Sequence, residues 1–188
     1  ALINMQRIQN QIPPYDKQRL LDEMGLFEPW YLNRHLGIKL DDEQKSVLES
    51  IFDLLITSAL QQPQVFVYQD AVVGPVTYDL VSLFKDCYVE WPRNKVEHWL
   101  EKYLQLTPVD IPVDKTRFIR WFDLMGVQRH LKVLGIFARL NYRDGKSQYL
   151  NDLPLTLKYV VDACKQYDEL SPLQNLLEST VLQHLEAS

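Results

Sequence analysis

The stretch DKTRFIRWFDLMGVQRHLKVLGIFARLNYRDG, residues 114–145, decides the fold. Its apolar residues recur at spacings of three and four, as on one face of an α-helix, and Asp114 is a candidate N-cap. Gly145 follows the last apolar positions, where glycine commonly ends a helix. The pattern predicts one long helix between these two residues. Gly126 and Gly135 lie inside it, where they weaken a helix but permit a neighbouring helix to pack closely.

The flanking sequence predicts a helical protein on both sides of this segment. Residues 1–35 favour helix, with a break at Ile12-Pro-Pro. Thr77 and Ser171 are candidate N-caps, and Pro172 suits the first turn of a helix because its missing N–H costs little there. Apolar spacing predicts the other helices at residues 41–62, 77–91, 94–108, 153–167 and from 171 onward.

A single segment, Val65-Phe-Val-Tyr68, is short and rich in strand-forming residues. It continues into Gln69-Asp-Ala-Val-Val-Gly-Pro75, which favours a turn. No second strand-forming run flanks it, so we expect a lone strand whose backbone groups lack partners, as if a pairing segment were missing. The predicted fold is mainly α, with a remnant β-strand near residues 65–68.

Composition excludes several classes of protein. The chain has 188 residues and a formal net charge of -5, which argues against a nucleic-acid partner. No apolar run is long enough to cross a membrane and no signal peptide is visible, so we expect a cytoplasmic protein. Cys87 and Cys164 predict neither a disulfide nor a zinc site and are expected to pack as small apolar residues. No glycine-rich phosphate loop is present.

Several stretches resemble one known superfamily. They are QDAVVGPVTYDLVSL (69–83), DLMGVQRHLKVLGIFAR (123–139) with RDGK (143–146) after it, and FEPWYLNRHLG (27–37). These resemble the aminoglycoside phosphotransferase or choline-kinase-like superfamily, and most of all the bacterial anomeric kinases of N-acetylmuramate and N-acetylglucosamine. The resemblance covers residues 1–188 as the helical C-terminal lobe of that protein-kinase-like fold.

The resemblance implies transfer of a phosphoryl group from ATP, with Mg²⁺, to the anomeric hydroxyl of a small sugar in cell-wall recycling. In that family the base is the Asp of a His-Arg-Asp loop, and an Asn and a second Asp bind the metal. Here Val67 runs directly into Tyr68, and roughly twenty residues that would hold all three are missing. The N-terminal lobe that covers ATP is missing too, so the chain alone is expected to be inactive.

Two explanations fit this gap between residues 67 and 68. Either the protein has the segment and the sequence omits it, which we favour because active-site loops are often poorly ordered. Or the segment is truly deleted, and the protein is a dead kinase.

The resemblance also assigns roles to residues that remain. Asp79 matches an acid that accepts hydrogen bonds from the catalytic-loop backbone, and a plain helix cap is the alternative. Asp70 matches an acid close to the Mg²⁺ ion that does not bind it directly, and turn formation is the alternative. Tyr68 is expected to pack inside.

A sugar substrate could be held by Arg129 and His130, whose cations suit the lactyl carboxylate of muramate. Lys132 lies in the same stretch. A solvated helix face is the alternative for these charges, and a partly buried, hydrogen-bonded side chain is the alternative for His130. Trp30 and Tyr31 could stack on the sugar ring, with burial in the core as the alternative.

Rival functions stay open at this stage. Within the superfamily, a kinase for choline, an aminoglycoside or homoserine is the alternative. From another class, the chain could be a helical interaction module or a pseudokinase. The sequence does not fix the oligomeric state.

Overall fold

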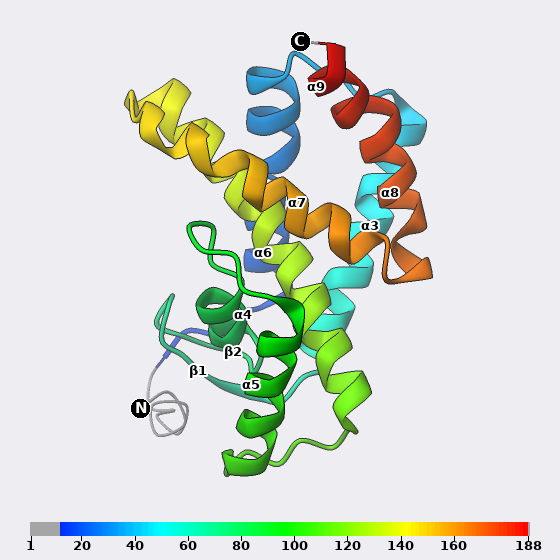
Figure 1. The fold of residues 1–188 in the computed structure, drawn as a ribbon. Coiled ribbons are helices and arrows are strands. Elements are labelled where there is room, and N and C mark those ends of the chain that lie inside the picture. Colours follow the sequence, from blue (N-terminus) through cyan, green and yellow to red (C-terminus); the bar gives the residue numbers. More distant parts are fainter. Residues whose placement is uncertain (1–11, 188) are drawn as a thin grey trace.

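In the computed structural model, which describes residues 12–187, the long predicted helix is α6 (Lys115–Asp144), and it runs through the centre of the molecule (Figure 1). The Asp114 side chain caps it by accepting a hydrogen bond from Arg117 N at 2.8 Å. Gly145 ends it in the left-handed conformation with φ 68°, which glycine adopts at little cost. Both predicted ends are confirmed.

The other elements surround α6. Along the chain they are α2 (Lys17–Met24), π-helix η1 (Phe27–His35), α3 (Asp42–Leu60), β1 (Gln64–Val67), β2 (Val72–Pro75), α4 (Tyr78–Phe84), α5 (Arg93–Leu106), 3₁₀-helix η2 (Ser147–Asp152), α7 (Leu153–Cys164), 3₁₀-helix η3 (Asp168–Leu170), α8 (Ser171–Leu177), π-helix η4 (Glu178–Leu182) and α9 (Gln183–Ala187). The mainly α fold is confirmed.

These elements are distributed along the length of α6 (Figure 1). α5 lies beside its beginning, where Tyr103 stacks on Phe118, the hairpin turn and α4 contact its middle, and η1 and η2 lie beside its later turns. α3 and α7 also pack on α6, and α8 packs on α3 and α7. Large apolar side chains from α2, η1 and α6 fill the centre, and both cysteines are buried there as expected.

Gly135 lies where α6 passes closest to the segment before η1. A Cβ atom there would lie 2.5 Å from the backbone carbonyl carbon of Leu26. The predicted close packing is therefore confirmed at Gly135. At Gly126 a Cβ atom would make only ordinary contacts, the nearest being 3.6 Å from Lys85 Cδ, so that glycine is not required for packing.

The prediction of a lone strand is wrong, because β1 has a partner. β1 and β2 form an antiparallel hairpin in which Val65 pairs with Gly74 and Val67 with Val72. The backbone also extends to the segment before α2, since Tyr15 N donates to Val73 O at 2.7 Å. Val72 and Val73 are β-branched and suit a strand. The valines of the supposed turn are thus the missing pairing segment, and the turn itself is only residues 68–71.

Three smaller predictions are also wrong. The helix expected over residues 77–91 ends at Phe84, and the carbonyl of the next residue, Lys85, lies 3.0 Å from His130 Nε2. Thr77 does not cap it, because its hydroxyl donates to Gln62 Oε1 at 2.7 Å. Ser171 is the first residue of α8 rather than its cap, although Pro172 lies in the first turn as expected.

Tyr68 requires a further correction, because this residue is 63% exposed rather than packed inside. It lies in the hairpin turn, outside the ladder that ends at Val67, so its side chain has no sheet face to pack against. Two further exposed aromatic residues, Tyr88 and Trp91, lie in the segment between α4 and α5.

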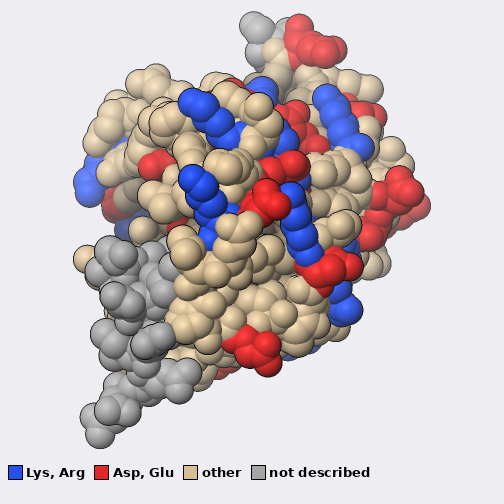
Figure 2. Space-filling view, turned by 60° about the horizontal axis from the view of Figure 1, so that its bottom comes forward, with Lys and Arg blue, Asp and Glu red and all other residues tan. Residues whose placement is uncertain are grey.

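The charged surface fits the composition. On the face shown in Figure 2, Lys and Arg side chains lie among Asp and Glu side chains and do not form a continuous basic patch. Within residues 12–187, no helix combines the length and the apolar composition needed to cross a membrane.

Candidate functional site

Asp79 lies in the first turn of α4, against the hairpin turn. Its two carboxylate oxygens accept backbone hydrogen bonds, from Tyr68 N at 2.8 Å and from Gln69 N at 3.1 Å. Burial raises the pKa of the Asp79 carboxyl, and the two N–H groups oppose that rise. A charged acceptor makes strong bonds to N–H groups, so Asp79 fixes the backbone that follows Val67. This is the kind of contact expected of a loop-organising acid.

Asp70 lies in the same turn and is held by α4 and α6. Its Oδ2 accepts a hydrogen bond from the Tyr78 hydroxyl at 2.6 Å and one from Lys132 Nζ at 3.2 Å. Burial alone would raise the pKa of Asp70, but Lys132 and Tyr78 hold it below its usual range. Arg129 Nη1 also donates to the Tyr78 hydroxyl, at 3.3 Å. The turn therefore gathers three of the predicted residues, Asp70, Asp79 and Arg129, around Tyr78.

A chain of polar contacts continues from this turn into the core. Lys132 Nζ lies 3.0 Å from Glu23 Oε1, and the Tyr15 hydroxyl donates to Glu23 Oε2. Gln128 Nε2 in turn donates to the Tyr15 hydroxyl at 3.2 Å. Buried polar groups are costly unless paired, so this network ties the hairpin, α2 and α6 into one arrangement.

A second buried network is built on Asp123 of α6. Its carboxylate accepts from Lys85 Nζ at 2.8 Å, from Arg93 through both Nη atoms at 2.7 and 2.8 Å, and from the Tyr167 hydroxyl at 2.6 Å. Burial would raise the pKa of Asp123, but Lys85 and Arg93 hold it low. The network joins the end of α4, the start of α5 and the residues after α7 to α6.

His130 is buried between these two networks. Its Nε2 lies 3.0 Å from the carbonyl oxygen of Lys85, and its ring stacks on Tyr159 with centroids 4.8 Å apart. Burial lowers the pKa of His130 to about 3, and the charges of Lys85 and Arg129 add to this effect. His130 is therefore neutral at pH 7, which argues against its predicted role as a cation for a sugar carboxylate.

The burial of His130 predicts an acid-sensitive stability. An unfolded histidine gains a proton below about pH 6.5, whereas the folded one stays neutral down to about pH 3. The free energy of unfolding should therefore fall by about 2 kcal/mol between pH 7 and pH 5. In His130→Gln this part of the pH dependence disappears, and urea denaturation at the two pH values measures it.

The matched control for this experiment is His98→Gln, on the exposed side of α5. Its pH dependence between pH 7 and pH 5 should equal that of the wild type. Equal slopes for the wild type and His130→Gln would contradict the neutral, buried state of His130.

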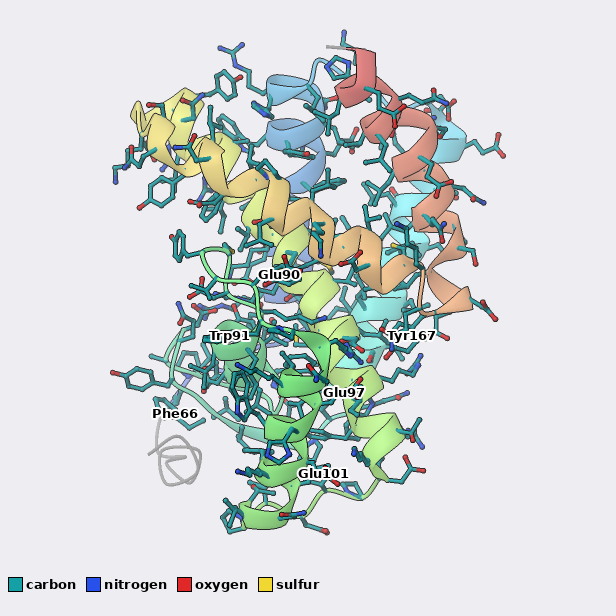
Figure 3. All side chains as sticks on the ribbon, viewed as in Figure 1. Phe66, Glu90, Trp91, Glu97, Glu101 and Tyr167 are labelled. Carbon is teal, nitrogen blue, oxygen red and sulfur yellow. The ribbon has the colours of Figure 1, made fainter. Side chains whose placement is uncertain are left out.

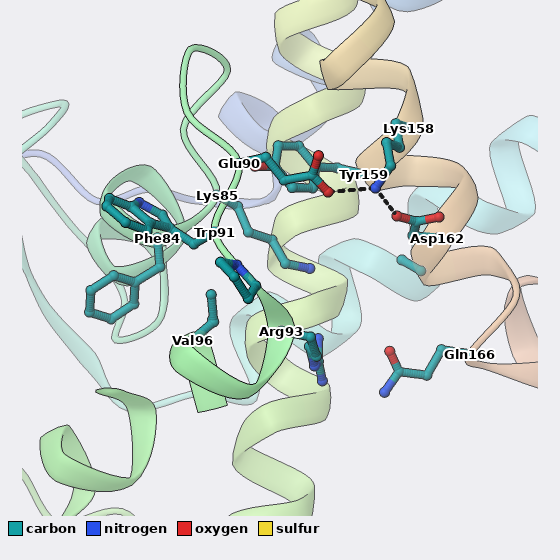
Figure 4. Close-up of a pocket in the computed structure, with 12 residues that line it drawn as sticks. Phe84, Lys85, Glu90, Trp91, Arg93, Val96, Lys158, Tyr159, Asp162 and Gln166 are labelled. Carbon is teal, nitrogen blue, oxygen red and sulfur yellow. Dashed lines mark hydrogen bonds and ion pairs between the residues drawn. The ribbon is translucent and has the colours of Figure 1, made fainter. Parts of the chain in front are cut away.

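A cavity of about 540 Å³ opens between the loop before α5 and the helix α7 (Figure 4). Phe84 and Trp91 lie on one side of it, and Lys158 and Asp162 on the other. Lys85 reaches from the loop into the space between them. The remaining lining residues are Glu90, Pro92, Arg93, Val96, Tyr159, Ala163 and Gln166.

The sequence did not point to this cavity. Glu90 and Trp91 lie in the loop where a helix was expected, with Glu97 farther along α5 (Figure 3). Lys158 and Asp162 are four residues apart, which is typical of an exposed ion pair on a helix. The stretch EWPR (90–93) before α5 was the available signal, because it places an acid, an aromatic ring and a cation together.

Trp30 and Tyr31, predicted to stack on a sugar, are both in η1 and do not line this cavity. Tyr31 is buried between Phe27 and His35, with ring centroids 5.5 and 5.8 Å away, as the alternative of core burial expected. Trp30 is partly buried and lines a separate shallow hollow with Arg34.

The described residues do not fit a Mg²⁺ site. Within residues 12–187 no three His, Cys, Asp or Glu side chains come together as possible metal ligands. Asp79 already accepts two backbone N–H groups, and Asp70 already pairs with Lys132. Carboxylates committed in this way are poor ligands for a cation that needs several free oxygens. No glycine-rich loop for nucleotide phosphates is present either.

Comparison with known proteins gives a consistent set of relatives. The N-acetylmuramate/N-acetylglucosamine kinases of Pseudomonas aeruginosa, Pseudomonas putida and Neisseria meningitidis are 42%, 41% and 36% identical to this chain. The matches cover 95%, 94% and 96% of this chain, but only 60%, 60% and 61% of the relatives. The chain thus spans about 60% of the length of these curated relatives. No protein-family model matches it.

The lengths of these matches bear on the gap predicted at residue 67. The three matches extend over 204, 202 and 205 residues, although this chain has only 188. Within the matched region, the relatives therefore have residues without a counterpart in this chain.

Proposed function

As a homologue of the bacterial N-acetylmuramate/N-acetylglucosamine kinases over about 95% of its length, this chain is, we propose, the helical part of an ATP-dependent sugar kinase. The full-length protein would phosphorylate the anomeric hydroxyl of N-acetylmuramate or N-acetylglucosamine during cell-wall recycling. Because the reaction uses ATP, its proposed location is the cytoplasm.

The observation that carries this proposal beyond similarity is the position of Asp79. Its carboxylate holds the two backbone N–H groups that come directly after Val67. Phosphoryl transfer depends mostly on the positioning of a base and of charge-neutralising groups. A buried acid that fixes the backbone at this point is what such positioning requires, and a plain helix cap would not need to reach Tyr68 and Gln69.

We further propose that the base and the ligands of Mg²⁺ lie in a segment between residues 67 and 68. The described residues form no Mg²⁺ site, and the relatives have additional residues inside the matched region. The residues that hold ATP would likewise belong to the part of the relatives that this chain does not span. The chain alone is then inactive.

A second candidate is a non-catalytic protein, and one observation favours it for the sequence as printed. β1 and β2 pair directly through a turn of residues 68–71, in a continuous antiparallel register from Gln64–Pro75 to Val67–Val72. A chain that truly lacks the segment could therefore fold as a pseudokinase. The intact mass of the natural protein separates the two, because a mass of 22.2 kDa supports the pseudokinase and a larger one the kinase.

The test of the main proposal is ATP consumption by the full-length protein with N-acetylmuramate, N-acetylglucosamine, choline, homoserine and an aminoglycoside. We expect turnover with the two amino sugars and phosphate on the anomeric oxygen, which phosphorus NMR of the product identifies. Turnover with choline, homoserine or an aminoglycoside alone would instead support a kinase of the wider superfamily with a different substrate. Absence of any turnover would contradict the kinase proposal.

A further inference from the structure

We propose that the cavity between the loop before α5 and the helix α7 holds the sugar, and that Lys85 contacts the lactyl carboxylate that distinguishes N-acetylmuramate from N-acetylglucosamine. This inference rests on the proposed sugar-kinase function. It replaces Arg129 and His130, neither of which lines the cavity, with a cation that does.

The size and walls of the cavity suit a monosaccharide. Its volume of about 540 Å³ falls within the usual range for small-molecule sites, roughly 300–1,000 Å³. Trp91 is 39% exposed, so part of its surface remains open to a ligand. Aromatic faces pack well against the apolar side of a pyranose, whereas Glu90 and Asp162 can accept hydrogen bonds from its hydroxyl groups.

Lys85 is placed to bind an anion inside the cavity. Its side chain is only 12% exposed, and its ammonium group extends into the cavity (Figure 4). An ammonium group has three hydrogen-bond donors, and Asp123 takes one of them at 2.8 Å. Asp123 is already paired with Arg93 through both of its oxygens. Lys85 therefore shares Asp123 with Arg93, whose Nε also pairs with Glu97 at 2.6 Å, so these four groups together are neutral. A ligand carboxylate would accept hydrogen bonds from the donors of Lys85 that Asp123 does not take.

Lys158 lines the same cavity but is less suited to this task. Its Nζ lies 2.5 Å from Glu90 and 2.9 Å from Asp162, and its side chain is about half exposed. Two carboxylates around one ammonium group leave a net negative charge, which repels a third carboxylate. Lys158 thus belongs to a negatively charged group and Lys85 to a neutral one, and this difference favours Lys85 as the contact to the sugar carboxylate.

The decisive experiment compares kcat/KM for both sugars in the full-length protein. Lys85→Met should lower kcat/KM for N-acetylmuramate by about tenfold or more, the worth of one charged hydrogen bond. The value for N-acetylglucosamine should change by less than about threefold. Lys115→Met, in an exposed ion pair with Glu101 that does not line the cavity, is the control and should leave both values unchanged.

A second variant keeps the test decisive if Lys85→Met fails to fold. Trp91→Ala removes an exposed ring and should weaken the binding of both sugars about five- to tenfold, as measured by calorimetric titration without ATP. Trp30→Ala, which removes the rival ring in η1, should leave binding unchanged.

The possible results distinguish a failure of the proposed sugar site from a failure of the proposed kinase function. If the wild type turns over the sugars and Trp91→Ala binds them as tightly as the wild type does, the cavity is not the sugar site, although the protein is still a sugar kinase. If kcat/KM falls equally for both sugars in a folded Lys85→Met, Lys85 does not contact the lactyl carboxylate that distinguishes them. Absence of wild-type turnover with either sugar would overturn the kinase proposal itself.

Discussion

Gly135→Ala is expected to destabilise the protein by about 3 kcal/mol, the upper end of the usual cost of overpacking. The added Cβ atom would lie 2.5 Å from the carbonyl carbon of Leu26 and 2.6 Å from its oxygen. These are backbone atoms, which cannot turn aside as a side chain does, so α6 and the segment before η1 must separate. Alanine favours the helix by about 1 kcal/mol over glycine, and the clash outweighs that gain. Urea denaturation at pH 7 measures the loss.

Gly126→Ala is the matched control, since it makes the same change in the same helix. There the new Cβ atom would meet Lys85 side-chain atoms at 3.6 and 3.7 Å and His130 Cε1 at 3.9 Å. These are ordinary contacts, so the better helix propensity of alanine should raise stability by up to about 1 kcal/mol. Equal effects of the two substitutions would contradict the close approach of Leu26 to α6.

The difference between these two glycines shows what a helical pattern can and cannot predict. The spacing of apolar residues and the caps Asp114 and Gly145 predicted α6 almost to the residue, because these signals are local. Which glycine permits the contact depends on where Leu26 lies, more than 100 positions earlier in the chain. Local sequence holds no information about that position.

The hairpin was missed for a related reason. Val72 and Val73 suit a strand, but Gly74 and Pro75 within the same four residues are typical of a turn. The structure resolves the conflict through a tertiary contact, because a Cβ atom at Gly74 would lie 2.9 Å from Tyr15 Cβ. Gly74 therefore serves a close approach of the chain before α2, not a turn.

The candidate site likewise has residues that the sequence could identify and residues that it could not. Asp79 and Asp70 were found from a continuous motif, and their partners lie within about ten residues or on one face of α6. The cavity combines the loop before α5 with α7, two segments separated by about sixty residues. A pattern read along one chain cannot bring such segments together, and so Lys85 and Trp91 became visible only in the structure.

Asp79→Asn in the full-length protein is expected to lower kcat by about 100-fold, because misplacement of catalytic groups by about 1 Å can cost that much. The substitution replaces one carboxylate oxygen with an NH₂ group, which cannot accept the hydrogen bond from Tyr68 N or Gln69 N. The backbone after Val67 then loses one of its two anchors, whereas the cavity residues stay in place. The KM for the sugar should therefore change by less than about threefold.

Two further measurements distinguish an effect on the position of the catalytic groups from an effect on the folding of the protein. Asp53→Asn changes an exposed carboxylate that pairs with Lys17 at 3.3 Å, and its kcat should equal that of the wild type. Thermal unfolding fixes an assay temperature at which all three proteins are folded, since the loss of a buried hydrogen bond costs about 1–3 kcal/mol. A fall in kcat with an unchanged KM in folded Asp79→Asn is the signature of a positioning residue. Wild-type kcat in that variant would make Asp79 a helix cap alone, because a cap contributes to stability and has no reason to change the rate of phosphoryl transfer.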